Sequence, residues 1–128
     1  MNKTLNEWAQ DIHENAIKHG WWDDPNRSFG DIVALCHSEL SEALEEYRDH
    51  KPLAYCNSPY TDNGMYGINE PYEWGINDKP EGVAVEMIDC IIRILDWCGM
   101  MGVDVDAIME AKNDYNKMRP YKHGGKVM

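Results

Sequence analysis

The hydrophobic residues of this chain recur at the three- and four-residue spacing that is typical of helices, and no strand alternation stands out. Four helices are expected from this pattern. They cover residues 4–19, about 31–49, about 80 to Gly99 or Gly102, and 104–118. We therefore predict an all-α protein with a four-helix bundle core, in a single domain over residues 1–128.

The ends of these helices carry start and stop signals. Thr4, with Glu7 three residues later, forms a capping-box pattern, and Gly20 ends the first helix. Pro80 is favoured in the first turn of a helix, so we place the start of the third helix near it. Asp104 is expected to be the N-cap of the fourth helix.

A long segment, residues 51–79, separates the second and third helices. It holds prolines, glycines and aromatic residues, and loops longer than about 15 residues are uncommon in compact domains. Its aromatic content argues against disorder. We interpret it as an ordered insertion loop that covers the bundle or packs on a neighbouring subunit. The alternative is a direct contact with substrate.

The third helix is apolar around most of its circumference, yet it carries Glu86 and Asp89. On a helical wheel these two acids lie with Arg93 and Asp96 within an arc of about 80°. A helix that is apolar almost all round is normally buried, and carboxylates on it are costly unless they are paired. Arg93 can pair with Asp89, which leaves Glu86. The apolar surface exceeds what one helix can cover, so we expect it to pack against several elements, among them a second subunit.

A second pair of acids, Glu39 and Glu42, lies on the second helix beside its apolar arc. Taken alone, this pair is typical of a charged helix edge in water. Together with the third helix it predicts a metal site whose ligands are Glu39, Glu42, Glu86 and Asp89. Ligation by carboxylates alone favours a hard cation, Mg²⁺ or Mn²⁺ before Zn²⁺. Without the cation, the acids should repel one another, and some should have raised pKa values.

Charge and composition restrict the classes of function. The net charge of −11 over 128 residues disfavours nucleic acid as a partner. No apolar run reaches the roughly 18 residues of a membrane span, so no membrane is expected either. The N-terminus lacks the apolar core of a signal peptide, and the four cysteines show no C-x-x-C spacing. We therefore expect free thiols and a cytoplasmic location.

The fourth helix carries polar residues where its apolar stripe should continue. Val105, Ile108 and Met109 mark a stripe that we expect to be buried. Three polar residues continue the stripe: Lys112, Asn116 and Arg119. A basic tail over residues 119–128, which includes Lys126, follows. One interpretation is a frayed helix end whose long side chains reach water. The other is a cationic patch beside the metal, suited to a ligand with several phosphates.

These motifs resemble those of the MazG-like, all-α nucleoside triphosphate pyrophosphohydrolases. The resemblance is carried by E-x-x-E at residues 39–42, by E-x-x-D at residues 86–89, and by the ending K-N-D-Y-N-K-M-R-P-Y-K-H-G-G-K at residues 112–126. It implies a four-helix core, Mg²⁺ held by the four acids, and hydrolysis of a nucleoside triphosphate to the monophosphate and pyrophosphate. It also implies a homodimer or homotetramer with sites near subunit interfaces.

The chain departs from the family pattern at two places. The family often has Glu-Glu before the x-x-Glu, whereas here Ser38 precedes Glu39, and Glu46 is a candidate replacement. The gap from Glu42 to Glu86 is also longer than usual, and the insertion loop accounts for it. The second departure bears on the identity of the substrate more than on the chemistry.

A mechanism follows from these assignments. Glu39 or Glu42 orients or deprotonates the water that attacks the α-phosphorus, and pyrophosphate leaves. Four residues are predicted to hold the leaving phosphates: Lys112, Asn116, Arg119 and Lys126. Trp8 is a candidate to stack on the base, with Trp21 and Trp22 as alternatives, although Trp8 also fits a core position.

Two other classes of protein were weighed against this mechanism. A ferritin-like di-iron protein needs Glu-x-x-His pairs, and no His follows a Glu by three residues in this chain. A nucleotide-binding or regulatory bundle with a vestigial metal site is the non-enzymatic alternative. Hydrolysis of deoxynucleoside triphosphates with added Mg²⁺ separates it from the enzyme.

Overall fold

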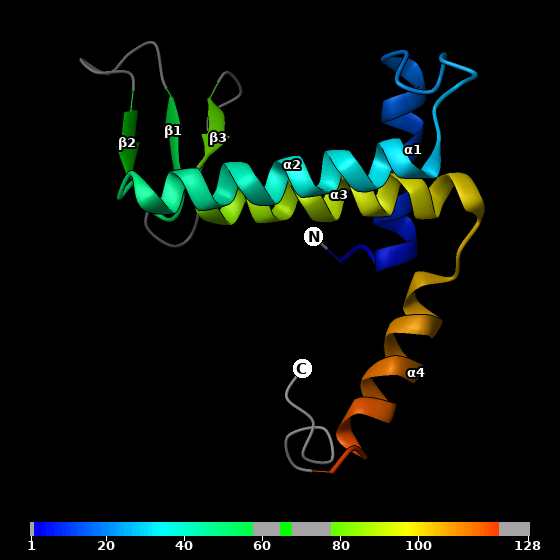
Figure 1. Cartoon of the computed structure of the whole chain (residues 1–128). Coiled ribbons are helices and arrows are strands. Elements are labelled where there is room, and N and C mark those ends of the chain that lie inside the picture. Colours follow the sequence, from blue (N-terminus) through cyan, green and yellow to red (C-terminus); the bar gives the residue numbers. More distant parts are fainter. Residues whose placement is uncertain (1, 58–64, 68–77, 121–128) are drawn as a thin grey trace. The chain divides into compact units, whose positions relative to one another are not determined.

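The computed structural model describes residues 2–57, 65–67 and 78–120, and these ranges are mostly helical (Figure 1). Their four helices are α1 (Leu5–Lys18), α2 (Phe29–Arg48), α3 (Val83–Met101) and α4 (Val105–Lys117). Three short strands of the described chain lie between α2 and α3: β1 (Tyr55–Asn57), β2 (Met65–Gly67) and β3 (Lys79–Glu81). The element content fits the predicted all-α class. Among the described residues, no helix has both the length and the apolar character that a membrane crossing requires.

The caps of α1 and α4 lie where the sequence signals predict them. The Thr4 hydroxyl accepts a hydrogen bond from the backbone N–H of Glu7, and the Glu7 carboxylate accepts one from the N–H of Thr4. Gly20, just past the end of α1, has a φ of 80°, which a glycine adopts without strain. Asp104 caps α4 through a bond from the N–H of Ala107.

The start of α2 lies two residues before the predicted position. Ser28 is the N-cap, and its hydroxyl accepts a bond of 3.1 Å from the N–H of Asp31. The Asp31 carboxylate accepts a bond of 2.9 Å from the N–H of Ser28. This is a capping box with Asp in the place that Glu or Gln usually holds. Asp31, in the first turn of α2, therefore completes the capping box by accepting the hydrogen bond from Ser28.

The prediction that α3 begins near Pro80 is wrong, because Pro80 lies in a strand and α3 begins at Val83. β1 is the central strand of an antiparallel sheet ordered β2-β1-β3. In its register Cys56 faces Pro80 and Asn57 faces Lys79. Strands of three residues are too short to show alternation, which explains why the sequence pattern missed them.

Gly82 forms the joint between β3 and α3. Its φ is 118°, and a Cβ on it would lie 2.4 Å from the carbonyl oxygen of Leu53. The same carbonyl accepts a 3.0 Å bond from the N–H of Ala84 at the start of α3. Only glycine fits this close approach, so Gly82 fixes the chain between β3 and the first turn of α3.

The chain forms two compact units. The first comprises Met1–Trp21 with Leu95–Met128, and the second comprises Trp22–Ile94. The core of the first unit is Ala9, Leu95 and Cys98, with five partly buried residues packed against it: Trp8, Ile12, Trp97, Val103 and Val105. The four-helix bundle core and the single domain stay predictions.

In the first unit, α1 and α4 cap each other. The N–H groups of Leu5 and Asn6 donate to the carboxylate of Asp106, at 3.1 and 3.2 Å. The Asn6 side-chain oxygen accepts a 2.7 Å bond from the N–H of Val105, and its amide donates a 2.9 Å bond to Asp104. A side chain at the start of each helix therefore satisfies free N–H groups at the start of the other.

The predicted buried stripe of α4 is correct only at its first residue. Val105 is half-buried, but Ile108 is 59% exposed and Met109 is 55% exposed. The first turn of α4 is hydrogen-bonded to α1, whereas the side chains of the later turns are exposed and are not buried by any described residue. Ile108 and Met109 are therefore corrected to surface residues of this chain.

Candidate metal site

α2 and α3 run side by side in the second unit (Figure 1), and they bring three of the four predicted ligands together. Glu39, Glu42 and Glu86 each offer a carboxylate oxygen, and these oxygens lie within 4.8 Å of one another. We call these residues the acidic trio. Glu39 is buried, Glu86 is half-buried and Glu42 is exposed. The spacing of three residues puts Glu39 and Glu42 on one face of α2.

Arg93 of α3 is the partner of the most buried carboxylate in the acidic trio. Its Nε donates a 2.8 Å hydrogen bond to Glu39 Oε1. Burial alone would raise the pKa of Glu39, but the hydrogen bond donated by Arg93, the hydrogen bond with Glu42 and the charge of Arg93 hold that pKa below its ordinary value. Sequence reasoning suggested Asp89 as the partner of Arg93, because it considered only neighbours on the same helix.

The pKa of Glu86 is shifted in the opposite direction, upward. Burial, followed by hydrogen bonds with Glu42 and Glu39 and the charge of Asp89, raises the pKa of Glu86 to about 8. At neutral pH this carboxyl therefore holds a proton, which relieves the repulsion between the acids. The raised pKa agrees with the expectation for acids that converge without a cation. A divalent cation bound here would displace that proton.

The fourth predicted ligand, Asp89, lies one turn after Glu86 and is half-buried. Burial and then the charge of Glu39 raise the pKa of the Asp89 carboxyl, while Arg93 and Lys79 act in the opposite direction. Asp89 therefore shares the electrostatic environment of the acidic trio. Among the described residues it does not belong to the group of converging oxygens, so its role as a ligand stays a prediction.

A pocket of about 360 Å³ opens beside the acidic trio within the second unit. We call it the α2–α3 pocket, and its lining residues are Glu42, Glu45, Glu46, Asp49, Lys51, Lys79 and Glu86. Sequence reasoning missed the two lysines, which lie at the ends of the insertion loop. The signal that places Lys79 here is the pairing of β3 with β1, which pattern analysis did not detect.

Glu46 is held at this pocket by a residue of the sheet. The hydroxyl of Tyr55 on β1 lies 2.9 Å from one oxygen of Glu46 and 3.0 Å from the other. Tyr55 is buried, and burial together with the hydrogen bond to Glu46 raises the pKa of its phenol. Tyr55 thus stays protonated and donates to Glu46. Tyr55, near the start of the insertion, therefore positions a carboxylate next to the acidic trio.

The predicted phosphate-holding residues belong to the other compact unit. Lys112 and Asn116 lie on α4, Arg119 follows it, and all three are exposed. The Lys112 ammonium lies 5.0 Å from the ring centre of Tyr115. Lys126 lies outside the described residues, as do residues 58–64, 68–77 and 121–128 of the insertion loop and basic tail. The phosphate role of these four residues stays a prediction.

Trp8 packs against the core of the first unit, and the ammonium of Lys3 lies 4.5 Å from its ring centre. Lys3 is itself paired with Asp11 at 2.7 Å. This placement agrees with the core position that was one of the two interpretations of Trp8. Stacking of Trp8 on a base stays a prediction.

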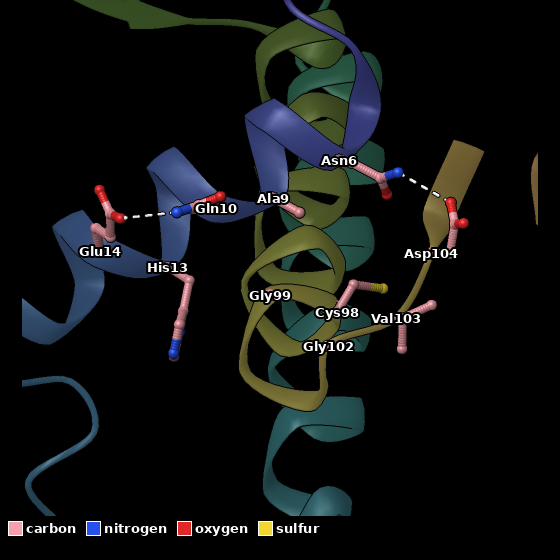
Figure 2. A pocket seen from close by; sticks show the side chains of 10 residues that line it. All are labelled: Asn6, Ala9, Gln10, His13, Glu14, Cys98, Gly99, Gly102, Val103 and Asp104. Atoms are coloured by element: carbon pink, nitrogen blue, oxygen red, sulfur yellow. Dashed lines mark hydrogen bonds between the residues drawn. The ribbon is translucent and has the colours of Figure 1, made fainter. Parts of the chain in front are cut away.

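A larger pocket, of about 490 Å³, lies in the first unit between α1 and the segment that joins α3 to α4 (Figure 2). His13 lines it and shares a 2.8 Å hydrogen bond with the buried Asp96. Figure 2 shows the thiol of Cys98 pointing away from His13, and burial raises the pKa of that thiol. These residues therefore do not make a cysteine–histidine nucleophile, and the acidic trio remains the candidate site.

The chain was compared with protein-family models, with curated proteins and with solved structures, and none of them matches it.

Proposed function

We propose that this protein hydrolyses (deoxy)nucleoside triphosphates to monophosphate and pyrophosphate in a Mg²⁺-dependent reaction, as the MazG-like family that it resembles does. One observation carries the proposal. Carboxylate oxygens of Glu39, Glu42 and Glu86 converge within 4.8 Å from two helices. The raised pKa of Glu86 supports it, because a proton there occupies the place that a cation would take.

The acidic trio fits the proposed ion in chemistry and in size. Carboxylate oxygens are the ligands that Mg²⁺ prefers, and Mn²⁺ accepts the same set. Oxygens on one octahedral Mg²⁺ lie about 3.0 Å apart when adjacent and about 4.2 Å apart when opposite, so oxygens within 4.8 Å of one another would each move by up to about 1 Å to bind one ion. Glu39, Glu42 and Glu86 would hold the ion, with Asp89 as fourth ligand. Bound Mg²⁺ would polarise the phosphate oxygens and neutralise their charge.

Glu42 is the better candidate for the base that activates water. Arg93 lowers the pKa of Glu39 and so weakens it as a base, whereas Glu42 is exposed and open to water. We propose that Glu42 takes the proton of the water that attacks the α-phosphorus in line. Four residues remain the proposed contacts of the leaving pyrophosphate: Lys112, Asn116, Arg119 and Lys126. Trp8 remains the proposed contact of the base.

We also propose that the protein is a homodimer or homotetramer, with a four-helix bundle core. Several large apolar side chains of α3 are nearly half exposed, with Ile88 at 51%, Ile91 at 45% and Ile94 at 45%. On α2, Leu40 is 42% exposed and Leu44 is 48% exposed. Large apolar side chains that are exposed on two neighbouring helices are typical of an interaction site. A second copy that covers it would remove this surface from water.

The decisive experiment is a screen of canonical and modified deoxynucleoside triphosphates for pyrophosphate release with Mg²⁺. We expect release with at least one of them, loss of release with EDTA, and loss in Glu86→Gln. Nucleotide binding without release from any of them would favour the non-enzymatic regulatory bundle. If Glu86→Gln releases pyrophosphate at the wild-type rate, the acidic trio does not take part in the reaction.

A further inference from the structure

The lining of the α2–α3 pocket includes two lysines, Lys51 and Lys79. Lys51 follows the end of α2, and its N–H donates a 3.2 Å bond to the carbonyl of Glu46. Lys79 opens β3, where it faces Asn57 of β1. Both lysines line the pocket that Glu42 and Glu86 also line. The end of α2 and the start of β3 therefore each bring one lysine to a cavity that shares its wall with the candidate metal site.

The existing partners of these lysines leave them available to a ligand. Lys79 lies 3.3 Å from Glu81, in a pair where the lysine side chain is 77% exposed, and such surface pairs are weak. Within the described part of the chain, the Lys51 ammonium forms no ion pair. Arg93, the cation bonded to the acidic trio itself, is engaged with Glu39. Lys51 and Lys79 are thus the basic residues that line this pocket.

The balance of charge in the pocket selects the class of ligand. Five carboxylates and two lysines line it, a formal excess of three negative charges. A bare polyphosphate would be repelled, and a lone cation would gain nothing from the lysines. A polyphosphate that carries a divalent cation satisfies both sets, because the carboxylates bind the cation and the ammonium groups bind phosphate oxygens.

We infer that Lys51 and Lys79 form a phosphate-binding pair that holds the terminal phosphates of a metal-bound nucleoside triphosphate in the α2–α3 pocket. This inference rests on the proposed function. It adds two residues from the ends of the insertion loop to the substrate contacts that the sequence suggested on α4. The two ends of the insertion would then contact the leaving pyrophosphate directly.

The test uses inorganic tripolyphosphate as the probe, because it has no base or sugar. Titration calorimetry on the full chain with Mg²⁺ should show binding to wild type and no binding in EDTA. Lys51→Gln and Lys79→Gln should each weaken binding by about tenfold or more, because each removes one charge-assisted hydrogen bond. Affinity for Mn²⁺ alone, followed by electron paramagnetic resonance, should not weaken in either variant.

Two controls separate this role from a structural one. Glu81→Gln breaks the same surface pair as Lys79→Gln but removes no phosphate ligand, so it should not weaken tripolyphosphate binding. Lys18→Gln removes an exposed lysine of α1 and should leave binding within twofold of wild type. Equal losses in Lys79→Gln and Glu81→Gln, or unchanged binding in both lysine variants, would overturn the inference.

The outcomes also distinguish this inference from the proposed function. Suppose that wild type binds Mn²⁺ and releases pyrophosphate, while both lysine variants bind tripolyphosphate as wild type does. The proposed phosphate-binding role of Lys51 and Lys79 is then wrong, and the proposed hydrolase function is retained. If wild type neither binds Mn²⁺ nor releases pyrophosphate, the proposed function fails and the phosphate pair fails with it.

Discussion

Arg93 on α3 holds Glu39 on α2 through a hydrogen bond of 2.8 Å between Nε and Oε1. The arginine side chain is 30% exposed and the glutamate side chain is 10% exposed, so the pair is shielded from water. It joins the two helices that carry the acidic trio. It also keeps the most buried carboxylate charged and oriented.

Removal of this arginine should destabilise the protein and the site together. In Arg93→Met, Glu39 loses its partner while it stays buried, which should cost about 2–3 kcal/mol of unfolding free energy. Urea denaturation measures that loss. A second substitution, Glu39→Gln, should recover part of it, because the double variant no longer buries an unpaired charge. An Arg93→Met variant as stable as wild type would contradict this account.

The proton on Glu86 should make the metal-free protein less stable as pH rises. The pKa of Glu86 is about 8 in the folded state and that of an ordinary glutamate in the unfolded state, so the folded state binds more protons between these values. Stability should therefore fall from about pH 4.5 to pH 8 by at most about 1.4 kcal/mol per pH unit from this group. Glu86→Gln should remove this component, as chemical denaturation at pH 5 and pH 8 would show. A slope identical in wild type and variant would contradict the assignment.

Asp89→Asn should abolish activity without loss of the fold. The substitution keeps the shape of the side chain but removes a charge that burial and Glu39 disfavour, so the metal-free variant should be at least as stable as wild type. Thermal melting and Mg²⁺-dependent pyrophosphate release measure the two effects. Near-wild-type turnover in this variant would exclude Asp89 from the site.

Gly99 should not tolerate a side chain. A Cβ there would lie 2.6 Å from the carbonyl oxygen of Ala9 and 2.8 Å from the Cβ of His13, so α1 and α3 would have to separate. We expect Gly99→Ala to cost about 1–3 kcal/mol of unfolding free energy. Gly30→Ala is the matched control, because its nearest atom, Ser28 Oγ, lies at an ordinary 3.5 Å. Equal stability of the two variants would show that the helices do not approach this closely in solution.

Substitution of Arg119 tests whether the residues at the end of α4 contact phosphate. If Arg119 binds the polyphosphate, Arg119→Ala should lose about 1.5–3 kcal/mol of transition-state binding, or roughly 10–150-fold in kcat/KM. Deletion of residues 121–128 should weaken triphosphate binding more than it lowers the melting temperature. If both changes leave kcat/KM within about twofold, the residues after α4 are a solvated end, and Lys51 and Lys79 become the main phosphate contacts.

The parts of the fold that local signals determine were predictable from the sequence. The Thr4–Glu7 capping box, the Asp104 cap and the acids at spacings of three each depend on residues within one helical turn. The convergence of Glu39, Glu42 and Glu86 followed from the same spacing, because carboxylates on two apolar-faced helices need a shared partner.

The parts that depend on distant residues were not predictable in this way. Pro80 has the local character of a helix start, yet its pairing with Cys56 places it in a strand. Arg93 has an available partner on its own helix, yet its bond to Glu39 crosses to α2. Tyr55 bonds Glu46, and Lys79 lines the α2–α3 pocket, on strands whose pairing cannot be predicted from a single sequence.

The mutual capping of α1 and α4 bears on the order in which the chain acquires its structure. Leu5 and Asp106 are 101 residues apart, so the first unit needs both ends of the sequence before its helix starts can be satisfied. Closing a loop of that length costs about 4 kcal/mol of chain entropy. The unit Trp22–Ile94, by contrast, is continuous and emerges from the ribosome earlier than α4. The acidic trio therefore lies wholly in the part of the chain that can assemble first, before the N-terminal helix contacts α4.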